Sequence, residues 1–172
     1  MERQPVPYDH QLSKTLSALQ KPGLLLAGTK PTGESNVMTI GWGTVGIIWG
    51  KPMFLVLVRP SRFTYEFIEE SKEFTVNVPT PDMNEWVAVC GSKSGRDLDK
   101  FGEYDMAITP GQQVKTVTID DCPMVYECRV MHWNHVLPPN LASEAEWSFY
   151  RGQDYHRVYF GEIVGTYASD DY

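Results

Sequence analysis

Two short stretches combine cationic side chains with small hydroxyl side chains, which suits them to binding a phosphate group. The first, Arg59-Pro60-Ser61-Arg62-Phe63-Thr64, leads into a predicted helix, whose N-terminus offers unpaired N–H groups and a partial positive charge. The second, Ser92-Lys93-Ser94-Gly95-Arg96, has the small residues that let backbone N–H groups close around an anion. Taken alone, the second stretch favours an ordinary solvated loop and the first is no better than a helix N-cap with surface arginines, but two such stretches in one acidic chain favour an anion site.

Among the four histidines, His156 has the position most suited to chemistry. It opens a predicted strand, and it either lines a cleft at the end of that strand or is an ordinary strand histidine. His132 and His135 lie three residues apart on another predicted strand, so their side chains point to opposite faces. Because no tetrahedral ligand set is completed, the sequence does not predict a metal site.

Motifs of nucleophilic or metal-assisted catalysis are missing from the sequence, which has no G-x-S-x-G, H-E-x-x-H or C-x-x-C. Gly41-Trp42-Gly43-Thr44-Val45-Gly46 matches the dinucleotide-binding pattern G-x-G-x-x-G. However, β-branched residues and then Gly50-Lys51-Pro52 follow it, so the required helix cannot begin there. We interpret residues 43–50 as a glycine-broken turn. The chain is therefore either a binding module or a protein whose cofactor supplies the chemistry.

The hydrophobic pattern predicts more strands than helices. Alternating or continuous apolar residues predict strands at residues 24–29, 36–42, 53–58, 73–78, 114–119, 124–135 and 155–167. Helical spacing predicts helices at 9–19, 63–71 and 82–90, with further helical turns in 97–104 and a loop at 138–154. Ser61 is the predicted N-cap of the second helix, and Asp82 with Glu85 a capping box for the third. Without βαβ alternation, we expect a mainly β protein, an antiparallel barrel or sandwich with short α-helices.

Composition describes an ordinary globular protein. A length of 172 residues suits a single domain spanning residues 1–172. A net charge of −7 argues against nucleic acid or an anionic membrane as a partner, and no apolar run approaches the ~20 residues of a membrane span. An odd count of three cysteines favours reduced thiols over a disulfide scaffold, so we expect a cytoplasmic protein.

Five blocks of sequence resemble the flavin reductase-like proteins of the FMN-binding split-barrel superfamily, in particular the flavoredoxin type. The blocks are NVMTIGW from Asn36, RPSRFTYEFI from Arg59, EFTVNVP from Glu73, CGSKSGRDLDKF from Cys90 and DYHRVYFGEI from Asp154. They occur in the order found in that family and span residues 21–164. The resemblance implies an antiparallel split β-barrel with Greek-key-like connections, a homodimer, and FMN as the cofactor.

The resemblance also implies roles for particular residues. Asn36, Val37, Met38 and Thr39 would line the edge of the isoalloxazine ring, largely through backbone groups. The ribityl chain and phosphate would be approached by Arg59, Ser61, Arg62 and Thr64, together with Ser92, Lys93 and Ser94. His156 would lie near the flavin face where a nicotinamide stacks. Asp154-Tyr155 departs from the Gly-Asp that many members have before this histidine, so its role rests on a partial motif.

We therefore predict an FMN-dependent oxidoreductase that passes hydride or electrons from NADH, NADPH or a redox partner protein to an acceptor. One alternative is an FMN electron carrier of the flavoredoxin type with no nicotinamide activity. The other is a barrel that binds a small ligand and has no redox function. The sequence does not distinguish NADH from NADPH, and it does not identify the acceptor.

Overall fold

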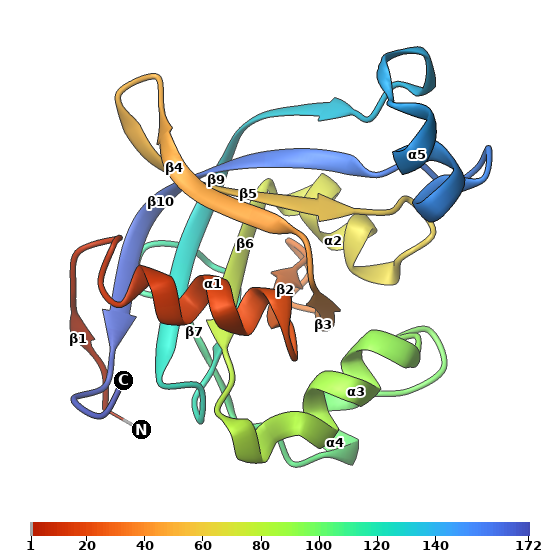
Figure 1. The fold of residues 1–172 in the computed structure, drawn as a ribbon. Helices are drawn as coiled ribbons and strands as arrows, with labels where there is room; N and C mark the ends of the chain where they lie inside the picture. Colours follow the sequence, from red (N-terminus) through yellow and green to blue (C-terminus); the bar gives the residue numbers. More distant parts are fainter. Residues whose placement is uncertain (1) are drawn as a thin grey trace.

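One curved antiparallel sheet forms most of the computed structural model, which describes residues 2–172 (Figure 1). Its strands pair in the order β3-β2-β6-β9-β10-β5-β4, and β1 pairs with β10. These strands are β1 Gln4–Pro5, β2 Leu24–Thr29, β3 Ser35–Ile40, β4 Gly43–Ile48, β5 Lys51–Val58, β6 Glu73–Val78, β9 Met124–His135 and β10 Arg157–Ala168. β7 (Ile108–Pro110) and β8 (Val117–Ile119) form a small second sheet.

Short helices surround this sheet (Figure 1). They are α1 Leu12–Gln20, α2 Phe63–Ser71, α3 Asn84–Ser92, α4 Lys100–Glu103 and α5 Ser143–Ala145, with 3₁₀ turns at Pro81–Met83 and Pro138–Asn140 and a π-helical turn at Glu146–Tyr150. None of them has the length and hydropathy that a membrane crossing requires.

The two edges of the sheet meet at a seam. β3 and β4 stand at opposite ends of the strand order, yet only Gly41 and Trp42 separate them in the sequence. The sheet must therefore curl until its edges come together, while no ladder joins β3 to β4 among the strands of residues 2–172. This arrangement is the predicted antiparallel split barrel.

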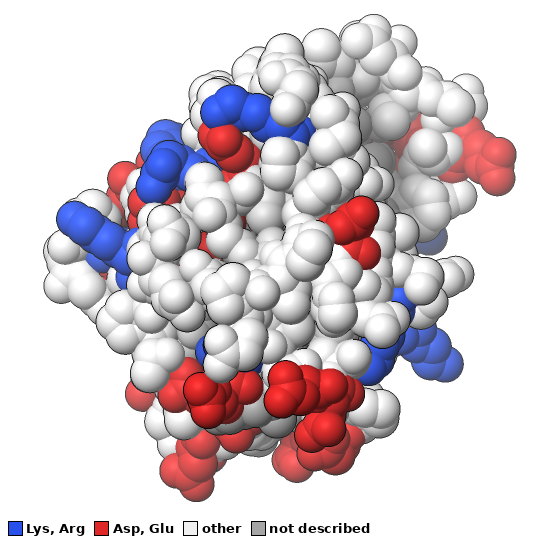
Figure 2. Space-filling model, turned by 90° about the vertical axis from the view of Figure 1, so that its left-hand side faces the viewer, with Lys and Arg blue, Asp and Glu red and all other residues white. Residues whose placement is uncertain are grey.

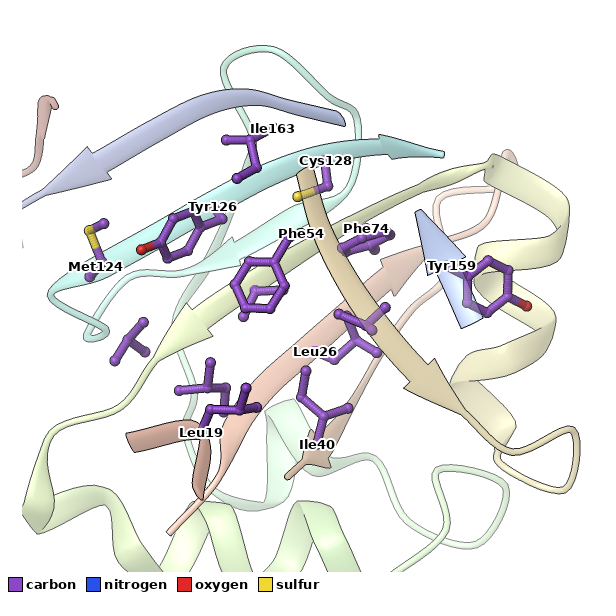
Figure 3. Close-up of a cluster of buried hydrophobic side chains, with 14 of the residues drawn as sticks. Leu19, Leu26, Ile40, Phe54, Phe74, Met124, Tyr126, Cys128, Tyr159 and Ile163 are labelled. Carbon is purple, nitrogen blue, oxygen red and sulfur yellow. The ribbon is translucent and has the colours of Figure 1, made fainter. Parts of the chain in front are cut away.

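The barrel encloses a continuous apolar core. Inward-facing residues of different strands pack together, as with Phe54 of β5, whose ring centroid lies 5.2 Å from that of Tyr126 of β9, on the far side of β10 in the strand order (Figure 3). Leu26 and Phe74 join the same cluster and are fully buried. Burying each such side chain stabilises the fold by roughly 1.5–3 kcal/mol. A smaller cluster, which includes Val37, Val87 and Cys90, holds α3 against β2 and β3.

Charge is unevenly distributed over the surface. Seen from the side of β1 and the β4–β5 hairpin, Asp and Glu side chains gather at one end of the molecule, and uncharged residues cover much of the middle (Figure 2). The excess of acidic residues is therefore not spread evenly over this face.

The prediction of a turn at residues 43–50 was wrong. Gly43–Ile48 form β4, which pairs along its whole length with β5, and the turn is confined to Trp49 and Gly50, which have positive φ. A Cβ on Gly43 would lie 2.6 Å from the carbonyl oxygen of Leu55. Glycine is required here by the close approach of two strands, a reason that the sequence pattern does not reveal.

Three smaller predictions were also wrong. The N-cap of α2 is Arg62 without a side-chain hydrogen bond, while the predicted cap, Ser61, donates its hydroxyl to Asp154. The Asp82/Glu85 capping box does not form, because a 3₁₀ turn precedes α3 and Met83 takes the N-cap position. The predicted loop at 138–154 contains α5 and the π-helical turn.

Candidate functional site

Two adjoining pockets lie where β3 meets the β5–α2 and α3–α4 connections. The first, here called the basic pocket, is lined by Asn36, Met38, Ser61, Arg62, Phe63, Thr64, Cys90, Gly91, Ser92, Lys93, Ser94, Gly95 and Lys100. The second, here called the aromatic pocket, is lined by Met38, Thr39, Ile40, Gly41, Trp42, Leu57, Arg59, Arg62 and His156. Because Met38 and Arg62 belong to both linings, the pockets form one elongated candidate site.

The basic pocket is strongly cationic. Its lining includes Arg62, Lys93 and Lys100 but no Asp or Glu, in a chain whose net charge is −7. None of these three cations takes part in an ion pair among residues 2–172. The fourth nearby cation, Arg96, is different, because its guanidinium pairs with Glu66. The pocket thus gathers positive charge that the described chain does not neutralise.

A buried amide positions one wall of the basic pocket. The side-chain nitrogen of Asn36 donates a hydrogen bond to the hydroxyl of Thr64 at 2.8 Å, which ties β3 to the first turn of α2. Gly95 packs directly on this amide, since a Cβ there would lie 2.1 Å from Oδ1 of Asn36. The backbone of the 93–99 connection can therefore approach β3 closely only because residue 95 has no side chain.

Lys100 lies at the inner side of the basic pocket. Its side chain is only 3% exposed, and its Nζ donates to the carbonyl oxygens of Val37 and Cys90 at 2.7 and 3.3 Å. Burial is the main cause of a lowered pKa for this ammonium, and the nearby Arg62 cation acts in the same direction.

Arg59 and Ser61 face a segment that is distant in sequence. The Arg59 guanidinium donates to the carbonyl oxygens of Phe149 and Asp154 at 2.7 and 3.0 Å. The Ser61 hydroxyl donates to the Asp154 carboxylate at 2.7 Å. These contacts fasten the segment that follows the π-helical turn beside the aromatic pocket. The Arg59 side chain therefore already has partners, whereas the Arg62 side chain forms no hydrogen bond or ion pair with residues 2–172.

His156 forms the inner end of the aromatic pocket. It immediately precedes β10, is 8% exposed, and packs against Trp42 with ring centroids 4.9 Å apart. Nδ1 of its ring lies 2.9 Å from the hydroxyl of Tyr150, which the π-helical turn supplies. Phe149 packs edge-on to Trp42 at 4.9 Å. Burial, assisted by the Arg59 and Arg62 cations and opposed by Asp154, lowers the pKa of His156 to about 4.

The structure brings together most of the residues singled out in the sequence. Ten of the eleven predicted cofactor-binding residues line one or both pockets: Asn36, Met38, Thr39, Arg59, Ser61, Arg62, Thr64, Ser92, Lys93 and Ser94, and His156 lines the aromatic pocket. Val37 lines neither pocket, because its side chain packs in the cluster beneath α3 and only its carbonyl oxygen reaches Lys100. Sequence reasoning did not assign Lys100, Tyr150 or Trp42 to the site.

No group of three or more His, Cys, Asp or Glu side chains among residues 2–172 is placed to hold a metal ion. The three cysteines, Cys90, Cys122 and Cys128, are buried free thiols whose pKa values are raised by burial. The site can hold an anion at one end and a planar apolar group at the other.

Known proteins share this fold and parts of this sequence. An uncharacterised protein of Archaeoglobus fulgidus is 31% identical over 108 residues, which make up 63% of this chain and 59% of that protein. The chain thus spans about three fifths of the length of this curated relative. The flavoredoxin of Methanosarcina acetivorans has a TM-score of 0.69 and 28% identity, over 87% of this chain and 70% of that chain.

A third similarity concerns the fold alone. The FMN-binding domain of a flavin reductase-like enzyme from Shewanella baltica has a TM-score of 0.67 and 21% identity, over 97% of this chain and 77% of that chain. The model of the flavin reductase-like domain matches residues 19–172. Since this match covers the chain from residue 19 onward, the protein belongs to the flavin reductase-like family.

Proposed function

We propose that this protein binds FMN and acts as an oxidoreductase that passes reducing equivalents from NADH, NADPH or a redox partner protein through the flavin to an acceptor. The observation that carries the proposal is the basic pocket, which is lined by three cations without a carboxylate and opens into a pocket with apolar and aromatic walls. FMN has a phosphate at one end, which suits the basic pocket, and a planar ring at the other, which suits the aromatic pocket.

The residues of the basic pocket fit a phosphate group. Arg62 and Lys93 have no ion-pair partner among the described residues, and hydrogen bonds from cations to phosphate are among the stronger ones in proteins. Ser92 and Ser94 add hydroxyl donors to the same lining. The named FMN-binding function of the Shewanella baltica domain, which shares the fold, supports the same ligand.

The aromatic pocket fits the ring system. Met38, Leu57 and Trp42 give it apolar walls, and Thr39 stands at the end of β3 beside them. A flavin bound there would accept a hydride and release electrons to an acceptor. The contribution of the chain is to hold the ring, to exclude water with Trp42 and Phe149, and to leave space beside His156 for a donor or acceptor.

His156 is proposed to act as a neutral hydrogen-bond donor. With a pKa of about 4, its ring is uncharged near pH 7. Tyr150, whose own pKa is raised by burial, keeps its hydroxyl proton, and a phenol is the better donor of the pair. We therefore infer that Tyr150 donates to Nδ1, which places the imidazole proton on Nε2. A donor there can orient a nicotinamide or an acceptor carbonyl.

An absorption spectrum recorded without oxygen tests the proposal. The purified protein reconstituted with FMN is titrated with NADH, with NADPH and then with dithionite. Bleaching by either nicotinamide supports the oxidoreductase, whereas bleaching by dithionite alone supports an electron carrier. Failure of the protein to bind FMN would contradict the proposal and leave the barrel that binds another small ligand as the remaining alternative.

The electron carrier is the second candidate, and the similarity to the Methanosarcina flavoredoxin favours it.

For either function we propose a homodimer. An aromatic cluster lies on the outer face of the β4–β5–β10–β9 part of the sheet. The ring centroids of Trp49, His132 and Phe160 are within 6.1 Å of one another, and Trp49 is 62% exposed. Exposed aromatic clusters of this kind are common at protein interfaces. The cytoplasmic location stays a prediction.

A further inference from the structure

Lys100 is a buried cation that has no anionic partner among the residues that the structure describes. It is 3% exposed and begins α4, and no ion pair among residues 2–172 includes it. An ammonium removed from water is costly unless opposite charge and hydrogen bonds replace its hydration. Within the described chain only two carbonyl dipoles do so, those of Val37 and Cys90.

One of the three N–H groups of Lys100 has no partner within residues 2–172. An ammonium carries three donors, and the contacts to Val37 and Cys90 account for two of them. The residue also belongs to the lining of the basic pocket, together with Arg62 and Lys93. The Lys100 ammonium therefore borders this pocket with one unused N–H donor and with a positive charge that no carboxylate neutralises.

We propose that Lys100 is a phosphate-binding residue that selects a phosphate monoester dianion in the basic pocket. Through the same ammonium, occupation of the pocket is linked to the contact that holds β3 to α3. The inference rests on the proposed FMN function and deepens it. A dianion completes the coordination of the ammonium that already fastens Val37 of β3 to Cys90 of α3. The Lys93 side chain makes no comparable hydrogen bonds to residues 2–172, so it would attract the phosphate from the α3–α4 connection without holding β3 to α3.

The affinity ratio between FMN and riboflavin separates this role from a purely structural one. Dissociation constants for both flavins are measured by fluorescence quenching for the wild type, for Lys100→Met, and for Lys115→Met as a control at an exposed lysine outside the pocket. We expect Lys100→Met to weaken FMN binding ten- to 100-fold and riboflavin binding less than threefold. Equal losses for the two flavins, or no loss, would overturn the proposal.

A second measurement uses the unaltered chain, in case Lys100→Met does not fold. The titration of the Lys100 side chain is followed by ¹³C NMR in the presence of FMN, riboflavin or inorganic phosphate. An anion beside the ammonium favours its charged form, so the titration midpoint should be higher with FMN than with riboflavin. Identical midpoints would refute the role of Lys100.

The outcomes also separate this inference from the proposed function. If the wild type binds neither flavin, the FMN function fails, and the response of Lys100 to inorganic phosphate still tests the anion site. If inorganic phosphate raises the midpoint and FMN does not, the site recognises free phosphate, and the selection of a monoester is refuted. If FMN is preferred over riboflavin equally in the wild type and in Lys100→Met, the function stands and the inference on Lys100 is wrong.

Discussion

The hydroxyl oxygen of Tyr150 lies 2.9 Å from Nδ1 of His156, and both side chains are buried. Tyr150 belongs to the π-helical turn and His156 immediately precedes β10, so the contact fixes the imidazole ring relative to the aromatic pocket. π-helical turns occur frequently at functional sites, which agrees with a role for Tyr150 in positioning His156.

Replacing Tyr150 by Phe should slow reduction of the flavin without releasing it. The substitution leaves Nδ1 without its donor, so part of the population should shift the proton from Nε2 to Nδ1. We expect a three- to tenfold slower bleaching of bound FMN by the active nicotinamide and a change of FMN affinity below twofold. Stopped-flow absorbance and ¹⁵N NMR of the imidazole measure both effects.

Tyr155→Phe is the matched control, because Tyr155 stacks on Tyr150 but donates its hydroxyl to Glu146. An equal slowing in the two variants would show that packing of the segment, and not the tautomer of His156, sets the rate.

Protonation of His156 should make the apoprotein less stable in acid. The folded-state pKa of about 4 lies below the ordinary value of 6.5, so between these values the unfolded chain binds a proton that the folded chain does not. Stability from this group is therefore complete above pH 6.5 and is lost as the pH falls toward 4, by at most about 3 kcal/mol. Urea unfolding of the wild type and of His156→Gln from pH 7 to 4 should show a shallower decline of stability in the variant, and equal declines would contradict this role of His156.

The wild-type protein should bind FMN more than tenfold more tightly than riboflavin. Charge-assisted hydrogen bonds contribute roughly 1.5–3 kcal/mol each, and Arg62 and Lys93 are both available in the basic pocket. Arg62→Ala and Lys93→Ala should each reduce the preference for FMN in a fluorescence titration. Equal affinities of the wild type for the two flavins would exclude a phosphate subsite.

Gly95→Ala should impair the basic pocket through a steric clash alone. The added methyl group would lie 2.1 Å from Oδ1 and 2.7 Å from Cγ of Asn36, so either the amide or the 93–99 connection must move. We expect FMN affinity to fall at least tenfold. Gly46→Ala is the control, since a Cβ there meets nothing within 4 Å. Unchanged affinity in Gly95→Ala would mean that this connection does not approach the cofactor.

Trp49→Asp should convert the proposed homodimer into a monomer. Trp49 has a φ of 53°, a conformation that Asp tolerates better than most residues, so the turn should survive the change. The substitution places a charge in the exposed cluster with His132 and Phe160. Light scattering at micromolar concentration should give twice the chain mass for the wild type and the chain mass for the variant. A monomeric wild type would refute the dimer.

Local patterns predicted the elements whose formation depends mainly on their own residues. Strands β2, β5 and β6 and helix α2 follow from apolar runs and helical spacing, and they fall within a few residues of the predicted bounds. β4 was missed because its two glycines suggest a turn, whereas its pairing with β5 is a tertiary relationship.

The same limit applies to the site. Phosphate-suited stretches were recognisable from residue type, but contacts between segments about 90 residues apart were not, and these give Arg59 and Ser61 their partners in the 149–154 segment. Lys100 could not be identified as buried, because a lysine in a short polar turn is normally exposed. Tyr150 was placed within a predicted loop, where no periodicity pointed to His156.

The seam between β3 and β4 has a consequence for how a ligand reaches the site. Both strands carry one edge that no neighbouring strand of residues 2–172 occupies, and the aromatic pocket borders the Gly41-Trp42 link between them. Widening the barrel at this line breaks no ladder hydrogen bond, so it should cost far less free energy than separating any paired strands. We therefore expect the proposed flavin to enter and leave by local opening of the native barrel, independently of global unfolding.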